Sequence, residues 1–399
     1  MVNVTDNFVA LDIGASSTRV VSDYAIIKTI PNNMVYVDNT KKIELEPHIK
    51  GKDLMDDVLA SLDVTICKTS GNPCNHFPVR VLVGELAERY SETNVRPSVM
   101  QNKTTQRINY ISAILGIAVE KLIRKLSDNI YIYVALPPLE VKNKRDEMRN
   151  QLVGSYEVTF NKINDGKKVT FTILDVESDE ESYMALMSFY FDMSGKLREE
   201  ARKYTTGNIL SLDIGASTTD LAVVKNMVYQ EKSGQTYKTG GNVVRGYVAN
   251  HIRDEFEYDP TQEVTEEAIA TGRLQAGGTY VVISDKVDEA KRRFAESIVA
   301  QVQEYFRMVN IPLQTVRAIV VSGGGSLSSK YEDENGQEVI TTGPISDYVT
   351  EKLQDICPGI EVVSYGDDSR LANIKGLFVR AYVAKIKRQK AAAEAEKQE

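Results

Sequence analysis

The sequence predicts two α/β domains related by an internal duplication. The first observation is a repeated segment: LDIGASST begins at Leu11 and LDIGASTT begins at Leu212, and seven of the eight letters are identical. The second is that short apolar runs alternate with amphipathic stretches in both halves, which is typical of strands alternating with helices. The third is the length of 399 residues, which exceeds that of most single domains.

Each copy of the repeat has the pattern of a β-hairpin: an apolar strand ends in an aspartate, a turn of small residues follows, and a second apolar strand begins. Glycine permits backbone angles that other residues avoid, and small side chains let backbone N–H groups approach a phosphate. One such turn is equally consistent with an ordinary hairpin, so the repetition favours phosphate binding. The candidate residues are Gly14, Ala15, Ser16, Ser17 and Thr18 in the first copy and Gly215, Ala216, Ser217 and Thr218 in the second.

The aspartates at the strand ends, Asp12 and Asp213, indicate a metal ion. A carboxylate directed at phosphates is repelled unless a cation lies between them. Mg²⁺ is the expected cation, and we expect it to be held through water.

Two further glycine turns lie in the second half of the chain. Gly323, Gly324 and Gly325 follow the apolar run 318–321, and Gly240 and Gly241 precede an amphipathic stretch. Without side chains, these turns can lie flat against a base, a ribose or a phosphate. Together with the two hairpins, they predict that one nucleotide and one metal ion bind between two domains.

The remaining elements are predicted in chain order. Residues 8–24 form the first hairpin, 25–49 further strands, 51–68 a short strand or helix pair, 70–78 a loop and 79–83 a strand. Then follow helix 107–126, strand 130–136, helix 141–152, the strand pair 157–160 and 169–176 around a turn at 164–166, and helix 181–203, which joins the halves. The second half contains strands 209–213 and 219–224, helices 244–256, 264–274 and 287–309, strand 316–321, helix 344–356, strand 360–363, helix 371–386 and a charged tail, 387–399, expected to be a fraying helix or disordered.

Composition excludes several classes of protein. The formal net charge of −8 argues against direct binding to nucleic acid, which needs a basic surface. No apolar run approaches a membrane span and no secretory signal is evident, so we expect a cytoplasmic protein without a membrane partner. The three cysteines form no C-x-x-C pair, and Cys67, Cys74 and His76 do not match a zinc spacing.

These motifs resemble the actin-like ATPase superfamily, and the resemblance covers the whole chain. The segments 12–18 and 213–220 resemble its two phosphate loops, 321–325 its adenosine motif and 372–376 its second connecting helix. Three further segments, 83–87, 181–185 and 373–377, are similar to the plasmid-segregation actins of the ParM family. The resemblance implies an actin-like α/β fold of two duplicated ribonuclease-H-like domains with a nucleotide cleft between them.

The resemblance also implies domain boundaries. We expect domain I at 1–181, with an inserted subdomain at about 25–110, completed by the helix 371–386. Domain II is expected at 182–370, with an inserted subdomain at about 240–310.

In this family an acidic residue at the start of the interdomain helix orients the attacking water. Glu181 is the match that we prefer, because Ala185 and further apolar residues follow it at helical spacing. Glu177 remains a competing match, and the acidic run around both is also what a solvated helix N-terminus would show.

By resemblance, the expected activity is hydrolysis of ATP to ADP with Mg²⁺, GTP being an alternative nucleotide, coupled to assembly of the protein with itself into dynamic filaments. Such filaments segregate plasmid DNA through a DNA-binding adaptor protein of a partition system. The alternatives are another bacterial cytoskeletal filament and, less favoured, a non-polymerising enzyme similar to sugar kinases.

Overall fold

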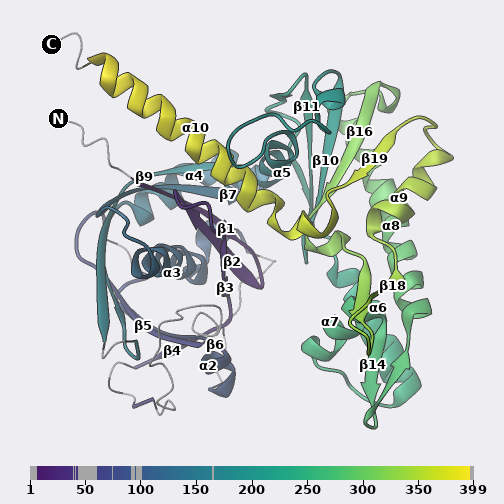
Figure 1. Cartoon of the computed structure of the whole chain (residues 1–399), viewed down its shortest axis with the longest axis horizontal. Coiled ribbons are helices and arrows are strands. Elements are labelled where there is room, and N and C mark those ends of the chain that lie inside the picture. Colours follow the sequence, from purple (N-terminus) through teal and green to yellow (C-terminus); the bar gives the residue numbers. More distant parts are fainter. Residues whose placement is uncertain are drawn as a thin grey trace. The chain divides into compact units, whose positions relative to one another are not determined.

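The computed structural model describes residues 7–38, 40, 42–43, 61–73, 75–90, 95, 101–163 and 166–395. The chain divides into two compact units (Figure 1). Unit 1 consists of the residues up to Leu197 together with those from Asn373 onward, and unit 2 is Arg198–Ala372.

Unit 1 is built on one large sheet, whose described strands run in the order β3-β2-β1-β7-β9-β8-β5-β6-β4. β1 and β2 form the predicted first hairpin, with Ile13 opposite Thr18. β7 pairs in parallel with both β1 and β9. The strands are β1 (Asn7–Ile13), β2 (Ser17–Ser22), β3 (Lys28–Pro31), β4 (Met34–Val37), β5 (Ser61–Lys68), β6 (Val79–Gly84), β7 (Asn129–Leu136), β8 (Gly154–Phe160) and β9 (Lys167–Glu180).

Helices cover the sheet of unit 1 and complete its core. α3 packs against the first hairpin so closely that a Cβ added at Gly116 would lie 2.8 Å from the Leu11 side chain. α10 packs against β1, where the rings of Phe378 and Phe8 meet edge-to-face at 5.5 Å. The helices of this unit are α2 (Glu85–Arg89), α3 (Arg107–Ile123), α4 (Pro138–Leu152), α5 (Glu181–Tyr190) and α10 (Ala372–Ala395), of which α10 begins at the last residue of unit 2.

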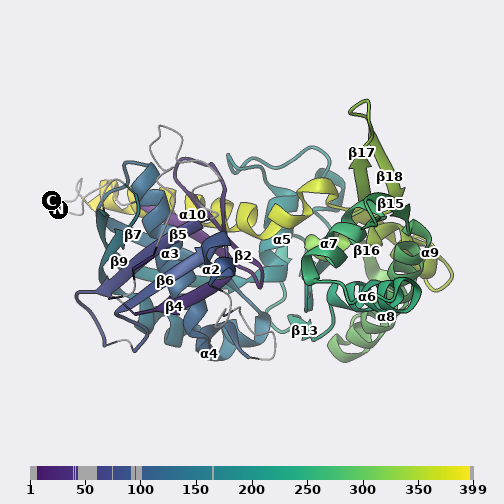
Figure 2. The same ribbon diagram turned by 90° about the horizontal axis from the view of Figure 1, so that it is seen from below.

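Unit 2 has a smaller sheet in the order β12-β11-β10-β16-β19, with β13 pairing to β11, and two separate hairpins. Figure 2 shows the β17–β18 hairpin extending away from the helices of this unit. The strands are β10 (Asn208–Ile214), β11 (Thr219–Lys225), β12 (Val228–Tyr229), β13 (Gln235–Tyr237), β14 (Arg273–Ala276), β15 (Thr279–Val282), β16 (Val316–Ser322), β17 (Ser329–Glu332), β18 (Glu338–Thr342) and β19 (Glu361–Ser364). The α-helices are α6 (Asn242–Phe256), α7 (Gln262–Thr271), α8 (Ser284–Val309) and α9 (Ile345–Gln354).

The two sheets repeat one local topology, as the duplication predicts. The order β2-β1-β7-β9 in unit 1 corresponds to β11-β10-β16-β19 in unit 2, an antiparallel hairpin followed by two parallel strands in each case. The second hairpin places Ile214 opposite Thr219, as the first places Ile13 opposite Thr18. The prediction of a duplicated α/β fold is therefore confirmed.

The predicted helix 181–203 was wrong in its length. α5 ends at Tyr190, and Phe191 is already in an extended conformation. The Asp192 carboxylate accepts hydrogen bonds from the backbone N–H groups of Ser194 and Lys196, and Gly195 has a φ of 78°. This side chain stabilises a turn that competes with the helix, a common property of aspartate.

The predicted helix 264–274 was also too long. α7 ends at Thr271 because Gly272 adopts the left-handed conformation, with a φ of 70°, that commonly terminates helices. Leu274 lies instead in β14, which pairs with β15.

Parts of several predicted elements lie outside the residues that the structure describes. These are the strands at 25–49, the strand or helix pair at 51–68, the loop position Cys74 and the turn at 164–166. The predicted C-terminal helix 371–386 is longer than expected, since α10 continues to Ala395 through most of the charged tail. None of the described helices combines the length and the hydrophobicity of a transmembrane span.

Candidate functional site

The turn of the first hairpin is held by a single buried asparagine. Gly14 N–H donates to the Ser17 carbonyl at 2.9 Å and closes the turn. Asn32 donates from Nδ2 to the Gly14 carbonyl at 2.6 Å and from its backbone N–H to the Ser16 carbonyl at 2.9 Å. In a trans peptide the N–H points opposite to the C=O, so the N–H groups of Ala15 and Ser17 face away from Asn32.

Asn32 is itself fixed by two hydroxyl groups. It is fully buried, and its Oδ1 accepts hydrogen bonds from Thr18 Oγ1 at 2.8 Å and from Ser112 Oγ on α3 at 3.0 Å. The turn is therefore rigidly attached to the core of unit 1.

The turn of the second hairpin is also held through its carbonyls, here by the segment that contains Gly241 and Asn242. Gly215 N–H donates to the Thr218 carbonyl at 2.9 Å, and the carbonyls of Gly215 and Ala216 accept from the N–H groups of Gly241 and Asn242 at 3.0 and 2.6 Å. The N–H groups of Ala216 and Ser217 consequently face away from α6. Outward-facing N–H groups in such turns can form a concave site for an anion. In the second turn they belong to successive residues, Ala216 and Ser217, whereas in the first they belong to Ala15 and Ser17.

The glycine turns of unit 2 meet at the end of β10. A Cβ at Gly240 would lie 2.7 Å from the Gly215 carbonyl oxygen and from the Thr218 nitrogen, and one at Gly241 would lie 3.2 Å from the Gly325 Cα. Gly323 has a φ of 91°, and a Cβ there would lie 2.3 Å from the Ile214 carbonyl oxygen. Gly240 and Gly323 need glycine because backbone passes directly against backbone, and Gly241 is tightly packed.

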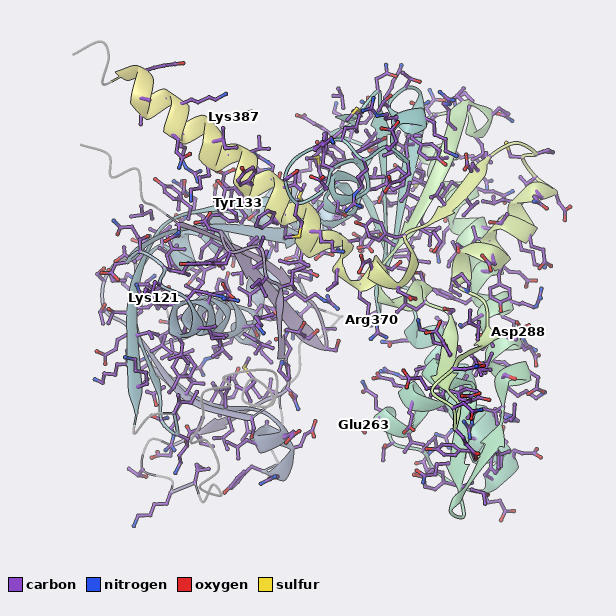
Figure 3. All side chains as sticks on the ribbon, viewed as in Figure 1. Lys121, Tyr133, Glu263, Asp288, Arg370 and Lys387 are labelled. Atoms are coloured by element: carbon purple, nitrogen blue, oxygen red, sulfur yellow. The ribbon has the colours of Figure 1, made fainter. Side chains whose placement is uncertain are left out.

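Gly324 lies at the edge of this cluster. A Cβ there would lie 3.3 Å from Cγ of Arg370, which is labelled in Figure 3 just before α10. Gly323 N–H donates to the Ser369 carbonyl at 3.1 Å, so the segment before α10 braces the glycine turn. The structure thus brings the three glycine-containing turns predicted for the second half together within unit 2.

The two aspartates are similarly buried but have different neighbours. Asp12 and Asp213 are each 5% exposed. Asp12 Oδ2 forms an ion pair with Arg19 Nη1 at 3.0 Å, whereas Asp213 Oδ1 accepts a hydrogen bond from Ser322 Oγ at 3.0 Å. Among the described residues, no three His, Cys, Asp or Glu side chains gather as a metal cage. A single buried carboxylate at the end of each strand suits Mg²⁺, which usually keeps several waters and takes one or two carboxylates.

Glu181 is the first residue of α5 and is 6% exposed. Its Oε1 forms an ion pair with Lys103 Nζ, from the short 3₁₀ turn Lys103–Thr105. Both residues belong to unit 1.

Glu177, the competing match, lies in β9 and is engaged by α10. Its carboxylate lies 3.3 Å from Arg380 Nη2 and 3.7 Å from Arg388 Nη1, and accepts a hydrogen bond from the Tyr133 hydroxyl at 3.0 Å. Figure 3 labels Tyr133 beside α10. Burial, partly offset by the hydrogen bond from Arg388, raises the pKa of Tyr133 to about 12. Glu177 thus fastens α10 to the sheet of unit 1.

The predicted site residues divide between the units. Asp12, the turn 14–18 and Glu181 lie in unit 1, whereas Asp213 and all the other predicted glycine-turn residues lie in unit 2. Sequence reasoning missed Asn32, Arg19 and Lys103. Arg19 could have been found from the hairpin register, which places it opposite Asp12.

Two family models match the chain. The model for the N-terminal domain of actin-like proteins matches residues 10–182, and the model for the C-terminal part of archaeal MreB-like actin homologues matches residues 211–331. No curated protein matches this chain in sequence.

Solved structures of similar fold cover nearly the whole chain. The actin-like protein Alp7A has a TM-score of 0.70 at 16% identity, covering 97% of this chain and 99% of that one. The archaeal actin homologue Ta0583 has a TM-score of 0.67 at 14% identity, covering 95% and 99%. Bacillus thuringiensis ParM with ATP has a TM-score of 0.65 at 16% identity, covering 96% and 100%.

The fold and the two matched family models define the class: the chain belongs to the actin-like ATPase superfamily. Its architecture is ParM-like, in agreement with the resemblance noted in the sequence. At these levels of identity, the solved structures establish the fold alone.

Proposed function

We propose that this protein binds and hydrolyses ATP and that the nucleotide state controls its assembly into filaments. The observation that carries the proposal is the duplicated anion site: each unit presents a turn whose carbonyls are anchored on an asparagine-containing segment and whose N–H groups face outward. One such site would be unremarkable, but two copies suit the β- and γ-phosphates of one nucleotide. The ParM structure solved with ATP supports this assignment.

In this proposal the two turns divide the phosphate contacts. Backbone groups of 14–18 and of 215–219 hold the β- and γ-phosphates, while the glycines of 240–241 and 323–325 line the nucleoside. GTP could occupy the same turns, because none of these contacts distinguishes the base.

Asp12 and Asp213 would hold Mg²⁺ through water. When bound, the ion neutralises charge on the phosphates. Arg19 contributes a second positive charge at the first turn, held in place by its ion pair with Asp12.

Glu181 orients the attacking water. Its position at the start of α5 and its burial support this role, whereas Glu177 lies within β9 and does not begin a helix. In phosphoryl transfer to water, positioning and charge neutralisation determine most of the rate. Glu181→Ala should therefore slow hydrolysis while ATP still binds.

In this proposal, ATP hydrolysis controls the assembly and disassembly of filaments. We propose that the filament is of the plasmid-segregating type, acts in the cytoplasm and reaches DNA through an adaptor protein, since a chain with a net charge of −8 is unsuited to coating DNA itself. The similarity to ParM and Alp7A supports this type, and the similarity to an archaeal actin homologue keeps another cytoskeletal role as the second candidate.

The experiment that tests nucleotide hydrolysis is phosphate release from ATP with and without Mg²⁺. We expect release that requires both Mg²⁺ and Asp213 and that is lost in Asp213→Ala. Asp259→Ala, which removes an exposed aspartate from the same unit, is the matched control and should retain full activity. Unchanged hydrolysis in Asp213→Ala would overturn the assignment of that residue.

A further inference from the structure

Lys103 and Glu181 are 78 residues apart in sequence and form an ion pair within unit 1. The Glu181 side chain is 8% exposed and that of Lys103 is 22% exposed. The pair is thus largely removed from water. Glu181 also begins a helix, so its backbone is fixed by α5 while its carboxylate is held by a residue from elsewhere.

The turn that carries Lys103 is fastened by a second buried carboxylate. Glu140, on α4, accepts hydrogen bonds from the backbone N–H groups of Lys103 and Thr104, each at 2.8 Å, and from Thr104 Oγ1 at 3.0 Å. Glu140 is 6% exposed. Three hydrogen bonds to one buried side chain hold this end of the turn in place.

Two residues of α3 hold the other side of the same turn. Asn109 Nδ2 donates to the Lys103 carbonyl at 2.9 Å, and the Tyr110 hydroxyl donates to the Thr104 carbonyl at 2.5 Å. Asn109 and Tyr110 are each 1% exposed. Both the N–H and the C=O of Lys103 are therefore bound by buried side chains, so its side chain reaches Glu181 from a fixed backbone.

Stability of the fold alone does not explain the Lys103–Glu181 ion pair and the hydrogen bonds that hold the turn of Lys103. A largely buried ion pair costs desolvation that often equals its Coulomb gain, and a pair of well-packed apolar residues usually serves stability as well. A carboxylate that must orient a water, however, has to be held within a fraction of an ångström, because small misplacements of reacting groups cost large factors in rate.

We propose that Lys103 is a positioning residue that holds the Glu181 carboxylate in the orientation needed to align the attacking water. This inference rests on the proposed ATP hydrolysis and on the role of Glu181 in it. Glu140 acts one step further out, by fixing the turn from which Lys103 reaches Glu181.

The test compares Lys103→Met with Lys168→Met, which removes a surface ion pair with Glu157 from the same unit. For Lys103→Met we expect kcat to fall roughly 10- to 100-fold while ATP affinity changes less than about twofold. Lys168→Met should leave both values unchanged. Lys103→Arg, which keeps the charge, should recover part of the lost kcat.

A double-mutant cycle separates positioning from a general structural effect. In the Glu181→Gln background, Lys103→Met should cause no further loss of kcat, because its effect passes through the carboxylate already removed. If Lys103→Met lowers the thermal midpoint of unfolding, Lys103→Gln is used in the cycle instead. It too should cause no further loss of kcat in the Glu181→Gln background.

The failure of this inference is distinguishable from the failure of the proposed function. A normal kcat in Lys103→Met or Lys103→Gln, or a raised KM with unchanged kcat, would overturn the positioning role while leaving ATP hydrolysis intact. A normal kcat in Glu181→Gln would instead overturn the role proposed for Glu181, and the positioning role would fall with it.

Discussion

Asp12 and Arg19 lie opposite each other in the first hairpin and form an ion pair, with 3.0 Å between Oδ2 and Nη1. At the corresponding register of the second hairpin, Asp213 lies opposite Asp220, so two carboxylates replace the ion pair. Asp220 accepts hydrogen bonds from the hydroxyl groups of Thr218 and Thr236. The duplication therefore preserved the shape of the turn but changed its charge, and the two units should contribute differently to binding a phosphate chain.

Replacing Arg19 should weaken ATP binding most when Mg²⁺ is absent. Arg19→Met removes a positive charge and leaves the buried Asp12 carboxylate without this partner beside the phosphates. We expect the affinity for free ATP to fall about tenfold or more, and that for Mg·ATP to fall less, because the metal ion offsets the negative charge of the Asp12 carboxylate. Titration calorimetry with and without EDTA measures both. Arg149→Met, on the surface of the same unit, is the control, and an equal loss with and without Mg²⁺ would contradict this view.

The two asparagines that brace the turns should differ in their effect on stability. The Asn32 side chain makes three hydrogen bonds and is fully buried, so Asn32→Ala should lower the free energy of unfolding by about 3 kcal/mol. Asn242 makes one described side-chain hydrogen bond, to Ser217 Oγ at 2.8 Å, and its replacement should cost about 1 kcal/mol. Urea unfolding followed by circular dichroism compares them, and equal losses would argue against the assigned contacts.

Replacing either of two helical glycines by alanine should change the stability of the protein, in opposite directions for the two positions. A Cβ at Gly376 in α10 would lie 1.8 Å from the Met184 carbonyl oxygen of α5, so Gly376→Ala should destabilise unit 1 strongly or displace α10. Gly246 in α6 has no atom within 4 Å of the same position, and Gly246→Ala should stabilise the protein by roughly 0.5–1 kcal/mol. Thermal midpoints of the two variants provide the test, which would fail if both shifted in the same direction.

Lys291 on α8 should make stability depend on pH in the alkaline range. It is 3% exposed, and its Nζ lies within hydrogen-bond distance of four oxygens, from Leu327, Ser329, Thr342 and Gly343. Burial lowers its pKa to about 8, partly offset by the Asp288 carboxylate. Between this pKa and the usual 10.5, the unfolded chain binds more protons than the folded one. Stability therefore increases as pH rises through this window and is lost as pH falls through about 8.

The comparison of wild type with Lys291→Met isolates this contribution from other titrating groups. Between pH 7.5 and pH 10.5, the wild type should gain up to about 3 kcal/mol in unfolding free energy relative to the variant. Lys286→Met, which removes a partly exposed lysine from the same helix, is the matched control variant. A difference between wild type and Lys291→Met that stays constant with pH would contradict the lowered pKa.

Much of the fold was predictable because its signals are local. The repeated hairpins, the glycine turn after β16 and the long apolar periodicity of α3 and α8 are all visible in short stretches of sequence. The helix ends were less predictable. The end of α5 depends on one side chain, that of Asp192, which stabilises a turn, and the end of α7 depends on the conformation of Gly272.

The supporting residues of the site were not predictable because they depend on tertiary contacts. Lys103 meets Glu181 only because Glu140 and α3 fix its turn, and nothing near Lys103 in the sequence indicates a partner 78 residues away. Asn32 likewise reaches the first turn from the end of β3. Local patterns therefore identified the turns themselves, whereas the groups that hold them required the structure.

The most direct test of the central claim is 90° light scattering of the purified protein on addition of Mg·ATP, with phosphate release followed in parallel. Mg·ADP, no nucleotide and the Asp213→Ala variant are the controls. We predict that scattering rises with Mg·ATP alone and decays as phosphate appears, as expected of a filament whose stability depends on its nucleotide. Phosphate release without any rise in scattering, at every protein concentration tested, would contradict the filament and favour a non-polymerising enzyme of the same superfamily.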